Sequence, residues 1–450
     1  MIDAVLVGPQ RRTTANRATK NAAGWGGNPD GASCSEQVLG QGGWNPLAPA
    51  PASAAMKSTP ALLATALAIS GCGAAISPGA SPTPPGRPDA SSPPVPDGGG
   101  GDLDGGTSFQ GEITYTETGY DLLAVDSTGT AYAVNLSGSG AEIWSGNDGR
   151  AWQKRGSIAS GASFWNLAPL ADGTLLADVV SGARHALARS IDRGVTWSEV
   201  LSTGAYRSLT PHSFAELDGA VYFLEYQVFT TASTPIRLWR SSDRGATWAV
   251  QHTFEGHRHG HGMVPDPARH ALWAFFGDTD PQSGTYRSTD GGASWTAIVA
   301  GSQDGDLVDA ALLPDGSLLC GQDISYRGST PDKPEIARIA LDGTVTHLMT
   351  LPSASYSTHA VRSGGYVVGT TYELDNDVSP PGWTRGSLWG SVDGLAWEKL
   401  LDVPQLDPKE DVRADVYWEL ASGEQVVSVR NAAGFGPGGR GYMLLRLTRR

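Results

Sequence analysis

Cysteine is scarce in this chain of 450 residues, with three copies, at positions 34, 72 and 320. We expect no disulfide framework, because Cys34 and Cys72 lie in the N-terminal quarter described below and Cys320 lies in an apolar strand pattern, SLLCGQ. A chain of this length does not need one, since it can bury most of the surface that its unfolded form exposes.

Positive charge is also scarce. The chain has 32 Lys and Arg against 46 Asp and Glu, a net charge of −14, and residues 107–145 contain neither Lys nor Arg. Phosphate backbones and acidic lipid surfaces attract proteins with a net positive charge. We therefore expect no nucleic-acid partner and no membrane binding by charge alone.

Long apolar runs are missing as well. The apolar stretch Ala61–Ile69 is too short to span a bilayer as a permanent helix. It follows Met56 and Lys57 and precedes Ile69-Ser70-Gly71-Cys72, and this order resembles a bacterial lipobox. The resemblance implies translation from Met56, cleavage before Cys72 and a lipid on Cys72. A plain secretory signal with a chance cysteine is the alternative.

These features predict four parts. Residues 1–55 form a disordered or mis-assigned extension, residues 56–71 a lipoprotein signal peptide, and residues 72–107 the lipidated cysteine with a Pro/Gly/Ser-rich tether. Such a composition cannot bury a core and holds a domain off a surface. Residues 108–450 form the folded domain, which we expect at the bacterial cell envelope, lipid-anchored at the outer membrane or cell surface.

One short motif recurs through the folded domain, as SIDRGVTW from Ser190, SSDRGATW from Ser241 and STDGGASW from Ser288. Looser copies start at Ser145 and Ser391. Asp and Ser side chains accept hydrogen bonds from their own turn, Gly takes the positive φ and Trp forms an apolar plug. The predicted structural positions are Ser190, Asp192, Gly194, Trp197, Ser241, Asp243, Gly245, Trp248, Ser288, Asp290, Gly292 and Trp295.

The motif resembles the Asp box, or BNR repeat, of sialidase-like β-propellers. The resemblance implies that the boxes lie at the blade periphery, away from the active site, and that their Asp residues are structural. With a degenerate copy at residues 340–344 and a strand pattern at 442–449, a period of about 50 residues predicts an all-β fold of seven four-stranded blades. We expect residues 110–118 to close the ring, and a six-bladed ring is the alternative.

Histidines suggest a metal site on the face opposite the boxes. In the sequence HRHGH from His257, alternation places the side chains on one face of a strand, and neighbouring inner strands start near further His and Asp residues. Neutral imidazole is the commonest metal ligand. The predicted ligands of a divalent metal are His212, His259, His261, Asp309 and His359. The alternative is a polar, water-filled channel mouth.

Acidic and aromatic residues follow the predicted second strands. Carboxylates flanking a sugar, with an aromatic platform beneath it, are what glycoside hydrolysis requires. The catalytic candidates are Asp278, Glu225, Tyr226 and Glu373, and the ligand-binding candidates are Trp383, Arg362, Asp323 and Tyr326. The alternative is that the loops of an acidic protein are acidic.

Sialidases also have three Arg residues that bind the substrate carboxylate, and a Tyr nucleophile paired with a Glu. The adjacent residues Glu225 and Tyr226 are candidates for that pair. No Arg or Lys precedes the first box from residue 107 on, so one arm of that clamp is missing. A true sialidase is disfavoured.

We expect a monomer that binds a carbohydrate or envelope protein. The alternatives are an exo-acting glycoside hydrolase or lyase that uses rim carboxylates, with or without a metal, and an assembly factor for membrane complexes.

Overall fold

The structure, a computed structural model, describes residues 106–324, 333–374 and 382–450. Contacts divide the chain into two units, Met1–Ala66 and Leu67–Arg450, and the first lies outside the described residues. The predicted signal peptide, Cys72 and Tyr326 lie outside them too. In the described part of the chain, no helix has the length and apolarity that a membrane crossing requires.

Five antiparallel sheets have four strands each, and every sheet takes its strands in chain order. Their strands are β2 (Tyr120–Val125), β3 (Ala131–Asn135), β4 (Glu142–Gly146) and β5 (Gln153–Ser157); β6 (Ser163–Pro169), β7 (Leu175–Ser181), β8 (Arg184–Ser190) and β9 (Ser198–Gly204); β10 (Phe214–Leu217), β11 (Ala220–Leu224), β12 (Ile236–Ser241) and β13 (Ala249–Phe254); β14 (His259–Asp266), β15 (Ala271–Gly277), β16 (Gly284–Ser288) and β17 (Thr296–Ala300); β18 (Ala311–Leu312), β19 (Leu318–Gly321), β20 (Glu335–Ile339) and β21 (Val345–Thr350).

The remaining strands form an eight-stranded sheet. They are β22 (Ala354–Ala360), β23 (Tyr366–Tyr372), β24 (Arg385–Ser391), β25 (Glu398–Pro404), β26 (Val412–Glu419), β27 (Gln425–Arg430), β28 (Gly441–Arg449) and β1 (Phe109–Glu117). Two groups of four meet in this sheet, β22–β25 and β26–β28 with β1. Only two residue pairs of β23 and β26 join them, Thr371 with Arg413 and Tyr372 with Val412.

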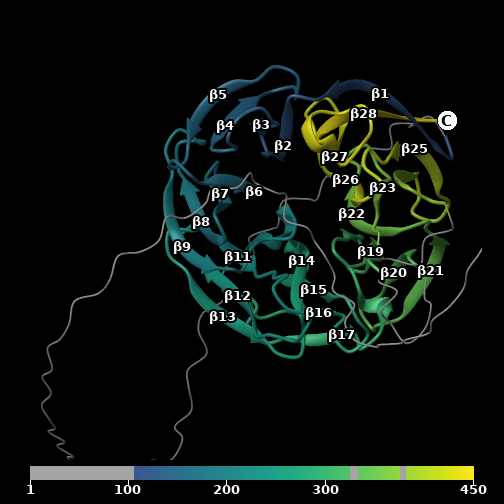
Figure 1. Cartoon of the computed structure of the whole chain (residues 1–450). Helices are drawn as coiled ribbons and strands as arrows, with labels where there is room; N and C mark the ends of the chain where they lie inside the picture. The colour runs from purple at the N-terminus through teal and green to yellow at the C-terminus, as the bar shows by residue number, and fades with distance from the viewer. Residues whose placement is uncertain (1–105, 325–332, 375–381) are drawn as a thin grey trace, which may run out of the picture. The chain divides into compact units, whose positions relative to one another are not determined.

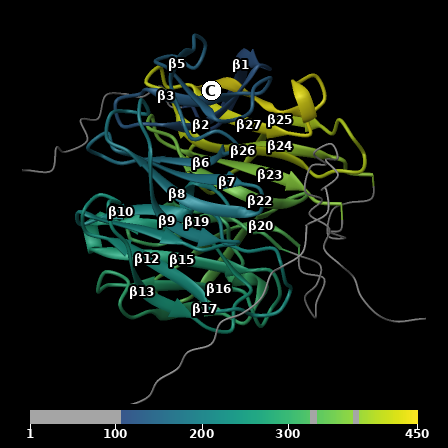
Figure 2. The same cartoon turned by 60° about the vertical axis from the view of Figure 1, so that its left-hand side comes forward.

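The two ends of the described domain pair with each other. β1 lies antiparallel to β28, from Phe109 opposite Arg449 to Glu117 opposite Tyr442. Figures 1 and 2 show β1 and the yellow C-terminal strand side by side, with the other sheets following one another round the unit. The expected closure by residues 110–118 is therefore confirmed, because β1 supplies the strand that β28 lacks at its outer edge.

The sequence pattern explains which strands face the core. All seven residues of β15 are buried, as are all five of β11, and both read as continuous apolar runs. The fourth strands, such as β5 and β17, are largely exposed, and β5 is polar as well. Four short 3-10 helices lie in the described connections. They are η1 (Pro211–Ser213), η2 (Pro267–Arg269), η3 (Gln303–Gly305) and η4 (Pro437–Gly439).

The repeated motifs form the turns between third and fourth strands. In the copy after β8, the Ser190 hydroxyl donates to Asp192 and accepts from the Gly194 amide, whose φ is +90°. Thr196 donates to Asp192 from both its amide and its hydroxyl. Hydrogen bonds from Thr196 lower the pKa of Asp192 to about 2. The Trp197 indole donates to Gly194 and its ring packs against a core cluster.

The copies that start at Ser241 and Ser288 repeat these bonds. Hydrogen bonds from Thr247 and Ser294 lower the pKa values of Asp243 and Asp290 to about 2 as well. Because neighbouring strands are antiparallel, these turns lie at the opposite strand ends from the loops that follow the second strands. Those loops carry the site described next.

Candidate functional site

Four carboxylates occupy equivalent places after the second strands of consecutive sheets. Glu225 directly follows β11, Asp278 follows β15, Asp323 lies two residues after β19 and Glu373 follows β23. The inner strands of these sheets begin at the same end, so the first residues of β14 lie next to the same loops. Two histidines begin that strand, at positions 259 and 261.

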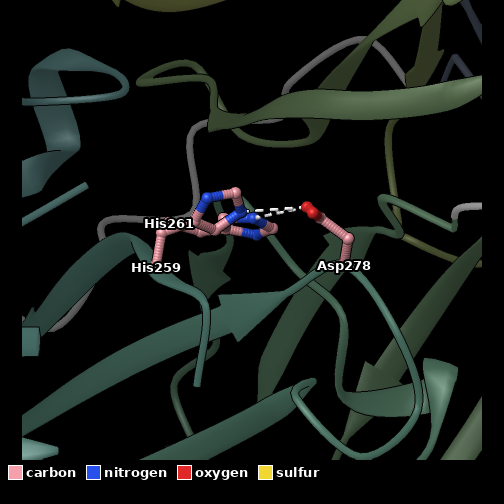
Figure 3. A group of neighbouring side chains, drawn as sticks. All are labelled: His259, His261 and Asp278. Carbon is pink, nitrogen blue, oxygen red and sulfur yellow. Dashed lines mark hydrogen bonds and ion pairs between the residues drawn. The ribbon is translucent and has the colours of Figure 1, made fainter. Parts of the chain in front are cut away.

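His259 and His261 both face Asp278. The Nε2 atom of His259 lies 2.9 Å from Asp278 Oδ1, and that of His261 lies 3.7 Å from the same oxygen. Figure 3 shows the two rings, both from β14, with Asp278 opposite them. The ring centroids are 4.9 Å apart, and the side chains of both histidines are 2% exposed. Sequence alternation thus brings these two together as expected.

The other nitrogen of each ring binds a backbone carbonyl. His259 Nδ1 lies 2.8 Å from Gln227 O, and His261 Nδ1 lies 2.9 Å from Leu307 O. A carbonyl only accepts, so each Nδ1 carries the proton, and a neutral ring then presents the lone pair of Nε2. Backbone carbonyls hold metal-binding histidines in this tautomer. Burial lowers the pKa of His261, which favours its neutral form.

In this tautomer, two hydrogen-bond acceptors face each other, the Nε2 atom of His259 and the carboxylate of Asp278. Their contact is favourable only when a proton or a metal ion lies between them. Burial alone would raise the pKa of Asp278. When the cation is a proton on the imidazoles, the charge and hydrogen bond of His259, the hydrogen bond of His261 and the charge of Arg258 hold that pKa well below its usual range. The Arg258 guanidinium forms an ion pair with the second oxygen of Asp278, and its Nε donates to Thr230 O.

Asp306 belongs to the site although the sequence patterns did not single it out. It is fully buried, its Oδ1 lies 3.4 Å from His261 Nδ1, and that oxygen has no hydrogen-bond partner in the described part of the chain. Burial, followed by the charges of Asp323 and Asp278, holds the pKa of Asp306 well above its usual range. Asp306 lies in the loop before β18, as His257 lies in the loop before β14. An alignment of those loops could have found it.

Gly277 makes the close approach possible. A Cβ at this position would lie 2.2 Å from His261 Cε1 and 2.3 Å from Asp306 Oδ1. Both distances are shorter than van der Waals contact, so any larger residue would push the His and Asp side chains apart. Only glycine lets β15 end against these two groups.

Asp323 and Glu373 extend the acidic side of the site. Burial, then the charges of Glu373 and Asp278, holds the pKa of Asp323 well above its usual range. Burial, with the charge of Asp411, raises the pKa of Glu373 to about 7. The Tyr356 hydroxyl donates to Glu373, and the Arg413 guanidinium lies 4.4 Å from the centre of the Tyr356 ring. A carboxyl that titrates near neutral pH is suited to proton transfer.

The site is therefore short of positive charge. Its four carboxyl groups, at positions 278, 306, 323 and 373, outnumber the guanidinium groups of Arg258 and Arg413 near them, and the charge of Asp411 also acts on Glu373. A divalent cation would favour the ionised form of these carboxyl groups. Two sets of described residues have donor atoms within 4.8 Å of one another, His259 with His261 and Asp278, and His261 with Asp306 and Asp323. Two imidazoles and a carboxylate suit a divalent transition metal.

Three of the five predicted metal ligands lie elsewhere, which corrects the expectation that all five converge. His212 Nδ1 lies 2.7 Å from Asp309 Oδ1, and the second oxygen of Asp309 accepts from the Thr358 amide. His359 Nε2 lies 3.9 Å from Glu419. These three residues have partners of their own. None of them belongs to either of the two groups whose donor atoms lie close enough to hold a metal ion. Asp278 takes the place that the sequence assigned to Asp309.

Glu225 and Tyr226 do not act as a pair. Adjacent residues of an extended chain point to opposite sides. The Glu225 carboxylate, fully buried, binds Arg237 at 2.7 Å and the Trp239 indole at 2.8 Å. Tyr226 instead stacks on His259, with ring centroids 4.3 Å apart. Glu225 is thus a structural ion-pair residue, whereas Tyr226 lines the site.

The other sequence candidates lie away from the His and Asp group. Trp383 lies beside β24 and β25, with Arg385 and Lys399 within 6 Å of its ring, at 5.4 and 5.8 Å. Arg362 follows the far end of β22 and donates to Leu420 O at 2.9 Å. His257 stacks on Phe276 and binds Gln282 O at 2.6 Å. None of these three reaches the Asp278 carboxylate.

Between 71% and 76% of the chain is similar in structure to proteins of distant sequence. No protein-family model matches it, and no curated protein matches it. A GH74 enzyme of Niastella koreensis is 14% identical over 71% of this chain and 59% of its own length, with a TM-score of 0.45. YCF48 bound to a D1 peptide is 13% identical over 76% of this chain and 97% of its own, with a TM-score of 0.45. A chain of a mitotic checkpoint complex is 12% identical over 74% and 93%, with a TM-score of 0.50.

The chain has a β-propeller fold. At these identities the likeness shows the fold alone. This chain spans about 59% of the length of the GH74 enzyme. The propeller is all-β, with four-stranded sheets and without α-helices among the described residues.

Proposed function

We propose that this propeller is a metal-dependent hydrolase that acts on a carbohydrate at the cell envelope. One observation carries the proposal. Two buried imidazoles have their Nδ1 atoms held by backbone carbonyls and turn their Nε2 atoms towards one carboxylate. A bound divalent metal would be held by His259, His261 and Asp278 and would supply an activated water. Three protein ligands with further positions open are typical of catalytic rather than structural sites.

The acidic residues supply the remaining chemistry. Glu373, with a pKa raised to about 7 by burial and the charge of Asp411, can accept a proton from water and return it to a leaving group. Arg258 fixes the second oxygen of Asp278, so the carboxylate keeps its orientation when charge near it changes. Tyr226 covers the His259 ring and excludes water from that side.

Two further parts of the proposal concern architecture and location. We infer seven blades, with the eight-stranded sheet counted as two, because only two residue pairs join its halves. We also propose that a lipid on Cys72 anchors the protein and that residues 72–107 tether the propeller. Mass spectrometry of the protein from a bacterial envelope fraction tests the anchor. An N-terminal fragment that starts at an unmodified residue other than Cys72 would contradict it.

Metal binding is tested first. The full chain, purified without and with chelator, is analysed by elemental mass spectrometry and thermal unfolding while Zn²⁺, Mn²⁺, Co²⁺ or Ni²⁺ is added. We expect one ion per chain and a raised Tm, since a ligand at 100 times its Kd adds about 2.7 kcal/mol of stability. His259→Ala and Asp278→Asn should weaken binding by about a hundredfold or more. His347→Ala, on the exposed strand β21, is the matched control.

Turnover is tested separately with a panel of oligosaccharides and product mass spectrometry. New products that vanish with chelator and with Asp278→Asn support the hydrolase. A folded protein that holds no metal and whose Tm no ion moves would overturn the metal site. A protein that holds metal and cleaves no glycan would overturn the hydrolase and leave a metal-dependent binding module, the other outcome that the sequence favours.

A further inference from the structure

A polar cavity lies next to Arg413. It is lined by residues of the first, second and third sheets and of β26 and β27, and its empty volume is about 640 Å³, the part open to solvent included. Arg413, whose guanidinium lies over Tyr356 next to Glu373, also lines this cavity and thus connects it to the acidic side of the metal site.

Two arginines of the cavity lie directly opposite each other. Arg413 on β26 is the register partner of Arg430 on β27. Side chains of such cross-strand partners stand on the same face with Cβ atoms roughly 5 Å apart, and like charges there are destabilising. Within the described part of the chain, no hydrogen bond or ion pair engages the Arg430 side chain, which is exposed to the water of the cavity.

The local charge is positive although the protein is acidic overall. Arg413, Arg430 and Arg440 line the cavity with two carboxylates, Asp121 and Asp415, of which Asp121 already forms an ion pair with Arg440. A guanidinium is ionised at neutral pH, and an anion between the two cross-strand arginines would relieve their repulsion.

Aromatic side chains complete the lining. Trp165, Tyr417 and Trp418 contribute to the wall, and the indole of Trp165 is fixed by a 3.0 Å hydrogen bond to Ser208 O. Aromatic faces pack against the apolar face of a sugar ring. The cavity thus combines two cross-strand arginines with aromatic side chains, although the Arg207 guanidinium lies 4.6 Å from the centre of the Trp165 ring, and Arg413 links the cavity to the acid-base groups of the site.

We propose that this cavity is a substrate subsite in which Arg430 and Arg413 bind the anionic group, carboxylate or phosphate, of a sugar. One part of this inference rests on the proposed function: the bond to be cleaved would lie at the metal site. The substrate is then an acidic rather than a neutral glycan. Recognition of the anion by this cavity stands independently of catalysis.

Calorimetric titration of the full chain at low ionic strength tests the subsite. Glucuronate, glucose 6-phosphate, glucose and inorganic phosphate serve as probes, so that the source of the anion is distinguished. We expect one of the two acidic sugars to bind and glucose not to bind. Arg430→Gln should weaken binding at least about tenfold, because a charge-assisted bidentate contact is lost. Arg430→Lys should be intermediate, and Arg155→Gln on the exposed strand β5 should bind as the parent does.

Thermal unfolding of the same variants without ligand gives an independent readout. Arg430→Gln should unfold at the parent's temperature or above it, because the variant removes a like-charge pair. A clear drop in Tm would make Arg430 a structural residue and overturn the subsite. So would the absence of binding by any anion, or unchanged affinity in Arg430→Gln. If inorganic phosphate binds as tightly as the acidic sugars, the cavity recognises an anion alone, and the claim that it binds a sugar is wrong.

The two proposals fail in different ways. His259→Ala should bind the acidic sugar as the parent does while it loses the metal, which shows that the cavity acts without the metal site. If no metal binds to the parent protein and the acidic sugar still binds, the proposed hydrolase is wrong and the anion subsite stands. If metal binds and no anion does, the subsite is wrong.

Discussion

Carboxylates at the two strand ends of this propeller have opposite properties. Asp192, Asp243 and Asp290 in the box turns are close to solvent, and local hydrogen bonds lower their pKa values to about 2. Asp306 and Asp323 at the other end are buried among like charges, and their pKa values lie well above the usual range. In the box turns, local hydrogen bonds stabilise each ionised carboxylate. At the other end, burial and neighbouring carboxylates perturb the pKa values strongly, and perturbed pKa values of this kind cluster at functional sites.

The largest effect should come from Gly277→Ala at the site end. The added Cβ would lie 2.2 Å from His261 Cε1 and 2.3 Å from Asp306 Oδ1. We expect metal affinity to fall about 10- to 100-fold and the free energy of unfolding to fall by about 1–3 kcal/mol. Gly138→Ala, whose nearest contact would be 3.5 Å, is the control. Unchanged metal titration in Gly277→Ala would show that the two groups have room to separate.

The pH dependence of stability should differ between the ends. Burial and the charge of Asp411 raise the pKa of Glu373 to about 7, above the ordinary value of 4.5. The folded state therefore binds a proton that the unfolded state has lost, and the contribution of Glu373 to stability falls as the pH rises from 4.5 to 7. The slope should approach about 1.4 kcal/mol per pH unit in chelator-treated protein. Glu373→Gln should reduce this slope, as measured by chemical denaturation across that range, while Asp306 and Asp323, whose pKa values are also raised, keep their own contributions.

The box end should show the reverse sign with a smaller effect. The folded pKa of Asp243 is about 2, set first by the hydrogen bonds from Thr247, so its stabilisation is present above the unfolded pKa and is lost as the pH falls towards 2. Asp243→Ala should lower the free energy of unfolding by about 1 kcal/mol at neutral pH and leave metal affinity unchanged. A loss of metal in this variant would mean that the two ends are coupled.

The smallest effect should come from Trp383→Ala. Its ring contacts Arg385 and Lys399 beside β24 and β25 rather than the metal site or the arginine cavity. We expect metal and acidic-sugar affinities within about twofold of the parent, since surface substitutions away from a site change free energies by about 0.5 kcal/mol or less. A larger change in glycan binding, measured by the same calorimetric titrations, would place a second binding surface on the outer strands.

The fold could be predicted from the sequence to a large extent because its signals are local. A box needs only Ser190, Asp192, Gly194 and Trp197 within eight residues, and the structure forms these bonds within one turn. Strand alternation in β14 likewise placed His259 and His261 on one side. The closure of the ring followed from counting strands, and β1 does pair with β28. The blade count stays a prediction.

The composition of the site could be predicted only in part. Asp278, Asp323 and Glu373 were found because each follows a second strand, a position that repeats. Asp306 was missed because the sequence pattern singled out Asp309 in the same loop before β18. The sequence could not tell that Glu225, at the same repeated position, is neutralised by Arg237 from the neighbouring strand β12. Partners across strands have no fixed spacing in the chain.

The sequence alone determined the all-β repeat, the box turns and the strand that closes the ring, because these depend on side chains that bond within a few residues or on periodic apolar patterns. Only the tertiary structure decided which carboxylates share space with His259 and His261, that His212 pairs with Asp309 instead, and that Arg413 lies opposite Arg430. Charges interact through space over a few ångströms. Residues from different sheets reach those distances only when the ring closes.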